Sequence, residues 1–134
     1  MSFTYLYKRE HHTDTSLEYM QALGMDEEQI ESILRQKEFE KLHSFKKSRR
    51  QQLDNAVVTI STGKKFDADE VSISRMLGRL YREQNSTDDT LVGWSLYTDP
   101  TGVKTQITLA ELKEAYQLAV DNMDALWGVT DETN

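Results

Sequence analysis

The sequence predicts an α+β fold in which a long N-terminal helical arm precedes a small β-β-α-β-β-α domain. Three observations indicate this class. First, residues 26–50 contain no glycine or proline. Second, short β-branched runs and turn sequences follow residue 54. Third, the formal charge of −7 is unevenly distributed along the chain. Residues 1–50 hold nine basic and nine acidic residues, whereas residues 51–134 hold seven and fourteen. We therefore expect a helical arm over residues 1–53, an α+β domain over 54–130 and a disordered tail over 131–134.

The arm is expected to contain a short helix at residues 16–23 and a long helix from Asp26 to about Arg50. Asp26 can cap the long helix, with Gln29 reaching back as in a capping box. At about 100° per residue the apolar side chains form two adjacent stripes that are thin for so long a helix. We expect this helix to project or to pack against another subunit, through the partner-binding residues Ile30, Ile33, Leu34, Phe39, Leu42 and Phe45.

The domain is expected to begin with a strand at residues 56–61 and a short returning strand that ends at Phe66. Asp67 and Glu70 have the spacing of a capping box and predict the start of a helix. The apolar residues of that helix recur at i, i+3, i+4 and i+7, which is typical of one buried face: Ile73, Met76, Leu77 and Leu80.

A hairpin around a turn at residues 99–102 and a final helix complete the predicted domain. Thr108 and Glu111 predict a second capping box, and Gly128 a glycine C-cap. We expect Trp94 in the hairpin to pack near the final helix. The two helices would then cover one face of a mainly antiparallel sheet.

The composition of the chain excludes several classes of function. The chain has no cysteine, which excludes disulfide scaffolds, cysteine-ligated metal sites and thiol catalysis. The pI of about 4.9 argues against a dedicated nucleic-acid binder. No apolar run approaches the roughly 20 residues of a membrane span, and the first five residues lack a signal-peptide pattern. We expect no membrane association and no export by that route.

Two acidic or histidine-containing clusters could ligate a metal ion. His11 and His12 lie near Asp14, but adjacent histidines do not share a helix face and a third ligand is not evident. Asp67 and Asp69 lack the glycine and the twelfth-position glutamate of a calcium loop. A mobile N-terminal segment and a helix cap are the favoured interpretations, so we expect no metal, cofactor or catalytic residue.

A basic run near the end of the long helix is the feature best suited to phosphate. It consists of Lys41, Lys46, Lys47, Arg49 and Arg50. Cations are also favoured near a helix C-terminus, so a solvated helix end explains the run without a ligand.

Residues 55–128 resemble a phage and prophage domain family of unknown function. The resemblance is carried by the phrase at residues 66–70, the pair Arg75-Met76, Trp94, the phrase at residues 108–112 and Trp127. Such domains commonly occur in proteins encoded beside tail fibre genes. The signature residues are caps, turns and aromatic residues, so they imply a fold rather than a catalytic site.

The resemblance implies a non-enzymatic protein of the phage tail module, either a tail fibre assembly factor or a small structural accessory. We expect it in the host cytoplasm, with retention in the virion left open, and we expect a homo-oligomer or a protein partner on the long helix. A phage regulator or inhibitor that binds nucleic acid or a host factor through residues 41–50 is the alternative. A metal-dependent enzyme using His11, His12, Asp67 or Asp69 is a third hypothesis.

Overall fold

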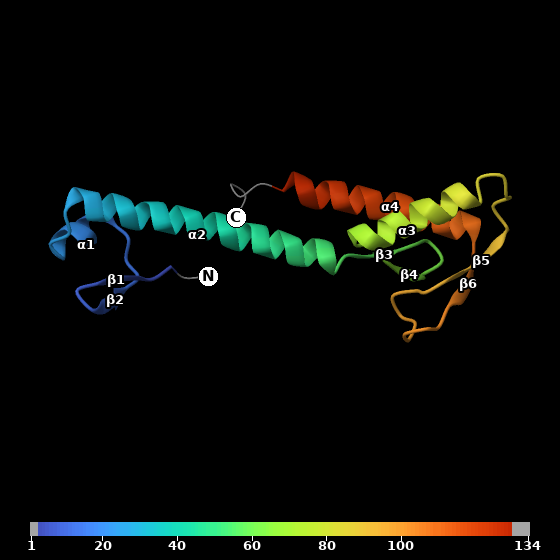
Figure 1. Cartoon of the computed structure of the whole chain (residues 1–134), viewed down its shortest axis with the longest axis horizontal. Coiled ribbons are helices and arrows are strands. Elements are labelled where there is room, and N and C mark those ends of the chain that lie inside the picture. The colour runs from blue at the N-terminus through green and yellow to red at the C-terminus, as the bar shows by residue number, and fades with distance from the viewer. Residues whose placement is uncertain (1–2, 130–134) are drawn as a thin grey trace. The chain divides into compact units, whose positions relative to one another are not determined.

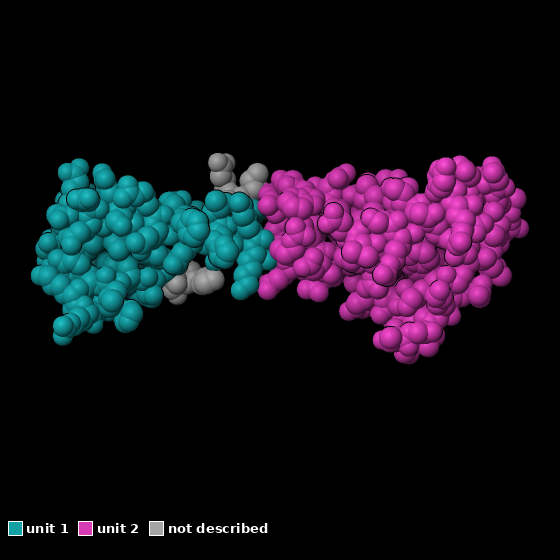
Figure 2. Space-filling view, viewed as in Figure 1, with its two compact units in different colours: residues 1–48 teal, residues 49–134 magenta. Residues whose placement is uncertain are grey.

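The computed structural model describes residues 3–129, and the chain divides into two compact units, Met1–Ser48 and Arg49–Asn134 (Figure 2). The predicted tail at 131–134 lies outside the described residues. The α+β class is confirmed (Figure 1). In chain order the elements are β1 (Tyr5–Tyr7), β2 (Glu10–His12), α1 (Leu17–Ala22), α2 (Glu27–Asp54), β3 (Val57–Thr59), β4 (Lys65–Asp67), α3 (Glu70–Arg82), β5 (Leu91–Trp94), β6 (Thr105–Thr108) and α4 (Leu109–Gly128).

The first unit begins with an antiparallel hairpin, β1–β2, where the sequence indicated a mobile segment. Tyr7 pairs with Glu10, so only Lys8 and Arg9 connect the strands. Their φ angles of 50° and 69° are left-handed, as a type I′ turn requires at both central positions. Tyr5 is buried, and its hydroxyl donates a 2.6 Å hydrogen bond to the Asp14 carbonyl. This hydrogen bond fastens β1 to the segment that follows β2.

A small apolar cluster holds the first unit together. Tyr5, Met20, Met25 and Ile30 are buried in it, one each from β1, α1, the α1–α2 connection and α2. The predicted cap of α2 is confirmed: the Gln29 amide N–H donates to Asp26 Oδ1 at 2.8 Å, and the Asp26 N–H donates to Gln29 Oε1 at 2.9 Å. The helix continues to Asp54, and its residues from Arg49 onward belong to the second unit.

The second unit has the predicted order β-β-α-β-β-α, but its strands form two separate hairpins rather than one sheet. β3 pairs with β4 and β5 pairs with β6, both antiparallel. One backbone hydrogen bond of 2.9 Å, from the Tyr97 N–H to the Lys65 carbonyl, joins the segment after β5 to β4. Helices α3 and α4 pack together beside these hairpins (Figure 1).

The core of the second unit is formed by β3 to β6 together with α3 and α4. Its fully buried side chains include Phe66 from β4, Met76 from α3, Val92 from β5, Ile107 from β6 and Leu112 from α4. Such burial excludes apolar surface from water and is the main stabilising term of a domain this small.

The boundaries of α3 and α4 correct two predictions. Asp67 ends β4 and does not cap α3; the N-cap is Asp69, whose carboxylate accepts a hydrogen bond from the Ser72 hydroxyl and not from a backbone N–H. The pairing of Val57 with Asp67 extends the hairpin through the expected cap position. Gly128 is the last residue of α4 rather than a left-handed C-cap, and Val129 follows in extended conformation.

The capping box of α4 is confirmed, and β5 ends well before the predicted turn at residues 99–102. Thr108 is the N-cap, and its side chain and that of Glu111 satisfy each other's backbone N–H groups. β5 ends at Trp94, and the carboxylate of Asp99 then holds the connecting loop. That carboxylate accepts hydrogen bonds of 2.9 Å from the Leu96 N–H and the Thr105 hydroxyl.

Candidate functional site

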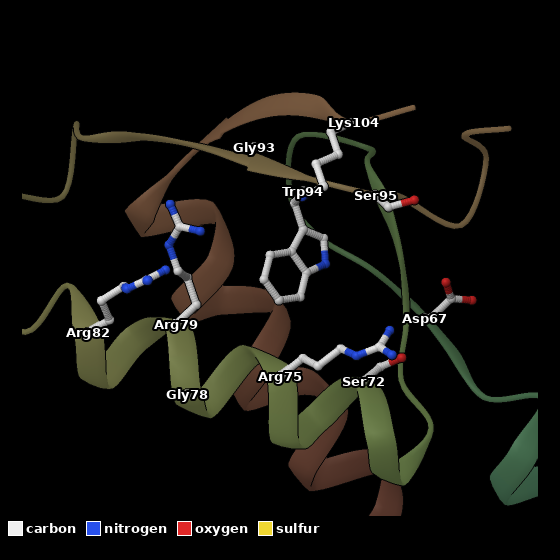
Figure 3. Close-up of a pocket in the computed structure, with 10 residues that line it drawn as sticks. All are labelled: Asp67, Ser72, Arg75, Gly78, Arg79, Arg82, Gly93, Trp94, Ser95 and Lys104. Carbon is white, nitrogen blue, oxygen red and sulfur yellow. The ribbon is translucent and has the colours of Figure 1, made fainter. Parts of the chain in front are cut away.

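A pocket of about 530 Å³ lies in the second unit, where β5 and the end of the loop before β6 face α3 (Figure 3). Ligand sites usually occupy about 300–1,000 Å³, so its size suits a small molecule. Arg75, Arg79 and Arg82 line it from α3, while Trp94 and Lys104 line it from the hairpin side. Figure 3 shows the Trp94 indole projecting from β5 toward α3, on the side to which Arg79 and Arg82 extend.

The three arginines form one row along α3. Their spacing of four and three residues places them on one side of a helix with 3.6 residues per turn. At about 100° per residue this row lies roughly 60–120° around α3 from Met76, which is fully buried in the core. Packing of Met76 in the core therefore places the arginine row on a flank of α3, beside the buried face, where it lines the pocket.

The pocket concentrates positive charge in an acidic part of the chain. Residues 51–134 contain seven basic and fourteen acidic residues, and four of those seven basic residues line this pocket. Arg79 Nε lies 3.4 Å from Glu83 Oε1, but this buried atom makes no hydrogen bond. Within residues 3–129, Arg75, Arg82 and Lys104 have neither an ion pair nor a hydrogen-bond partner.

Trp94 and two glycines shape the pocket. Trp94 is half-buried, with part of its surface packed against the core of the second unit. Gly78 lies in the middle of α3, where glycine costs about 1 kcal/mol relative to alanine. A Cβ at Gly78 would meet no atom within 4 Å, so packing does not require glycine there. A Cβ at Gly93 would make only ordinary contacts, at 3.7 Å from the side chains of Gln106 and Lys104.

Asp67 supplies the single carboxylate of the pocket lining. Its pKa is raised from the ordinary value, first by desolvation and second by the negative charge of Asp69. Ser72 also lines this end and donates its hydroxyl proton to Asp69. Asp67 and the hydroxyl oxygens of Ser72 and Ser95 therefore provide acceptors beside a strongly cationic wall.

The expected partner-binding residues differ in their burial. Ile30 is buried in the first unit and Ile33 packs against the same cluster, so both belong to that core. Leu34, Phe39 and Leu42 are exposed, with 71% of Phe39 accessible. Phe45 is half-buried.

The basic residues at the end of α2 do not form one stripe. Lys41, Lys46 and Lys47 are exposed, and at about 100° per residue they point in three directions around the helix. Arg49 and Arg50 lie over the Trp127 ring, at 4.5 Å and 5.9 Å from its centroid. Arg50 also pairs with Asp54 at 3.8 Å.

The two histidines of β2 lie on opposite faces of that strand. His11 is exposed, whereas His12 is buried, stacks on Tyr5 and has its Nδ1 2.8 Å from the Tyr19 hydroxyl. Asp14 accepts the Ser16 N–H at 2.8 Å, and this hydrogen bond lowers the pKa of Asp14. Across residues 3–129, no three histidine or acidic side chains are grouped as metal ligands.

The basic pocket was not predicted from the sequence, although part of its signal is visible there. The spacing of Arg75, Arg79 and Arg82 beside an apolar stripe indicates a cationic helix face. That Trp94 and Lys104 face this row depends on how the chain returns after α3, which no local pattern reports.

Two general findings complete this description. None of the helices in the described part of the chain combines the length and apolarity needed to cross a membrane. Comparison with protein-family models, with curated proteins and with solved structures gives no match.

Proposed function

We propose that this chain is a non-enzymatic binding protein that acts through the exposed apolar residues of α2: Leu34, Phe39 and Leu42. The carrying observation is the exposure of Phe39, a large aromatic residue on an otherwise polar stretch of helix. Exposed groups of large apolar side chains commonly mark protein interaction surfaces. The resemblance of residues 55–128 to a phage domain family supports a role as a tail fibre assembly factor or a small tail accessory.

The helix supports this role physically. Phe39 stacks on His43 one turn later, with centroids 6.3 Å apart, so the aromatic side chain has a defined place on the surface. Leu42 lies three residues after Phe39 and is 43% exposed. Residues three apart are neighbours on a helix, so the two side chains present one apolar surface to a second helix.

The experiment compares the wild type with the double variant Phe39→Glu/Leu42→Glu by light scattering. Both positions are exposed, so the variant is expected to fold, and circular dichroism checks this. The wild type should have the mass of an oligomer, and the variant that of a monomer. The control Gln36→Glu/Ser48→Glu adds the same charge at exposed polar positions and should leave the mass unchanged.

A second arm tests the assembly role. The gene for this chain should lie beside a tail fibre gene, and immobilised wild-type chain should retain the product of that gene while the double variant does not. Equal masses for wild type and double variant, together with equal retention of the fibre protein, would contradict the proposal.

A further inference from the structure

The pocket beside α3 has the features of a ligand site, and we propose that it binds a free nucleoside polyphosphate. In this arrangement the phosphates lie along Arg75, Arg79 and Arg82, and the base stacks on Trp94. The site is independent of the proposed α2 surface, since every residue that lines it belongs to the second unit.

The charge and spacing of the arginines suit a row of phosphates. Arginine guanidinium groups match the geometry of phosphate oxygens and bind them in pairs of parallel hydrogen bonds. Arg75 and Arg82 are separated by seven residues, roughly 10 Å along a helix at 1.5 Å per residue. A row of this length can contact more than one phosphate. With Lys104 the pocket carries four cations against one carboxylate, so a ligand with several negative charges suits it better than a monoanion.

Trp94 provides a surface on which the base of the nucleotide can stack. A half-buried indole whose body is fixed against the core provides a preorganised surface for stacking. Base stacking on aromatic side chains contributes about 1–3 kcal/mol per base. The absence of side chains at Gly78 and Gly93 leaves room for a planar group.

Asp67 favours a nucleotide over a simple polyphosphate. A carboxylate in a cationic pocket opposes the binding of a pure anion, but it accepts hydrogen bonds from sugar hydroxyls or from a base amino group. The volume of about 530 Å³ and the acidic character of residues 51–134 favour one free nucleotide over a long strand.

The test uses the full chain carrying Trp127→Phe, so that Trp94 is the single tryptophan. ADP is titrated without divalent cations, and fluorescence of Trp94 is measured. We expect saturable quenching with a Kd below about 1 mM, tighter than the binding of pyrophosphate in competition and tighter than that of adenosine. The single strand dT8 should bind more weakly than ADP.

Variants then locate the site. Arg75→Gln/Arg82→Gln changes two exposed side chains without partners and should raise the Kd at least about tenfold, since hydrogen bonds to charged groups are the strong ones. The control Arg35→Gln/Lys47→Gln makes the same charge change at exposed positions of the first unit and should bind as the parent does. The Trp94 variants are measured by calorimetry. Trp94→Leu should bind ADP more weakly than the parent does, and Trp94→Tyr should retain most of the affinity for ADP.

Three results with the parent chain would overturn the proposal. They are no saturable quenching by ADP, equal affinity for pyrophosphate and ADP, or tighter binding of dT8 than of ADP. Equal losses in the pocket variant and its control would also overturn it, because they would show that net charge and not this site governs binding.

Discussion

The Nζ atom of Lys64 lies 2.6 Å from Oε2 of Glu111, so an ion pair joins the β3–β4 turn to the first turn of α4. The same carboxylate accepts the Thr62 hydroxyl at 2.7 Å and the Thr108 N–H at 3.0 Å. Hydrogen bonding to Lys64, opposed by desolvation and aided by Thr108 and Thr62, lowers the pKa of Glu111 to about 2. One carboxylate thus caps a helix and fastens a hairpin to it.

Replacing Glu111 should destabilise the second unit in a pH-dependent way. The lowered pKa of Glu111 means that its stabilising effect is present above its ordinary pKa of 4.5 and is lost as the pH falls toward 2. At pH 7 we expect Glu111→Gln to reduce the free energy of unfolding by about 1–3 kcal/mol, measured by urea denaturation. The loss should shrink as the pH is lowered through this range.

The control for Glu111 is Asp124→Asn, which removes a carboxylate from an exposed position on the same helix. It should change stability by less than about 0.5 kcal/mol. Equal effects of the two variants, or a Glu111→Gln effect that does not change between pH 7 and pH 3, would contradict the role assigned to the pair.

Truncation of two adjacent residues of α3 to alanine should have very different effects on the free energy of unfolding. Met76 is fully buried, whereas Leu77 is 53% exposed. Met76→Ala should lower the free energy of unfolding by about 2–4 kcal/mol, because it removes buried methylene groups and leaves a cavity. Leu77→Ala should cost less than about 1 kcal/mol and serves as the matched control. Similar midpoints of denaturation for the two variants would contradict the placement of Met76 in the core and of Leu77 at the surface.

The turn between β1 and β2 carries strain that glycine should relieve. Arg9 has a φ of 69°, and a non-glycine residue costs about 1–2 kcal/mol in this region. Arg9→Gly should therefore stabilise the hairpin by about 1 kcal/mol, seen as slower amide hydrogen exchange in β1 and β2. Arg9→Ala removes the same side chain but keeps the Cβ, so it should give no such protection. Equal exchange rates in both variants would rule out the left-handed turn.

The glycine in α3 offers a test that separates stability from binding. Gly78→Ala should raise the free energy of unfolding by up to about 1 kcal/mol, because alanine favours the helix and its Cβ meets no atom within 4 Å. The bulkier Gly78→Leu should in addition weaken the binding of ADP in the Trp94 fluorescence titration. Ser74→Ala, at an exposed α3 position outside the pocket lining, is the control and should leave ADP binding unchanged. A loss of stability in Gly78→Ala would contradict the placement of Gly78 against open space.

Local patterns predicted the elements that depend on neighbouring residues. The capping boxes at Asp26 and Thr108 involve residues three apart, so their spacing alone is informative. The order of strands and helices in the second unit followed from the alternation of turn sequences and apolar periodicity.

Features that depend on distant parts of the chain could not be predicted in the same way. Asp67 has the spacing of a cap, but pairing with Val57 keeps it in a strand and leaves the cap position to Asp69. The hairpin β1–β2 depends on the burial of Tyr5 beside α1 and α2, which compensates for a turn sequence that is unfavourable by itself. The pocket requires β5 to return across α3, so the arginine spacing could indicate at most one of its walls.

The separation of the strands into two-stranded ribbons has a consequence for aggregation. No sheet within residues 3–129 has more than two strands, so each strand has an edge without a continuous ladder partner. Such edges can recruit strands from other molecules, but edges of three or four residues offer few backbone groups for templated growth. The protein therefore gains protection against edge-to-edge polymerisation from the shortness of its strands, and a mutation that lengthened β5 beyond Trp94 would weaken that protection.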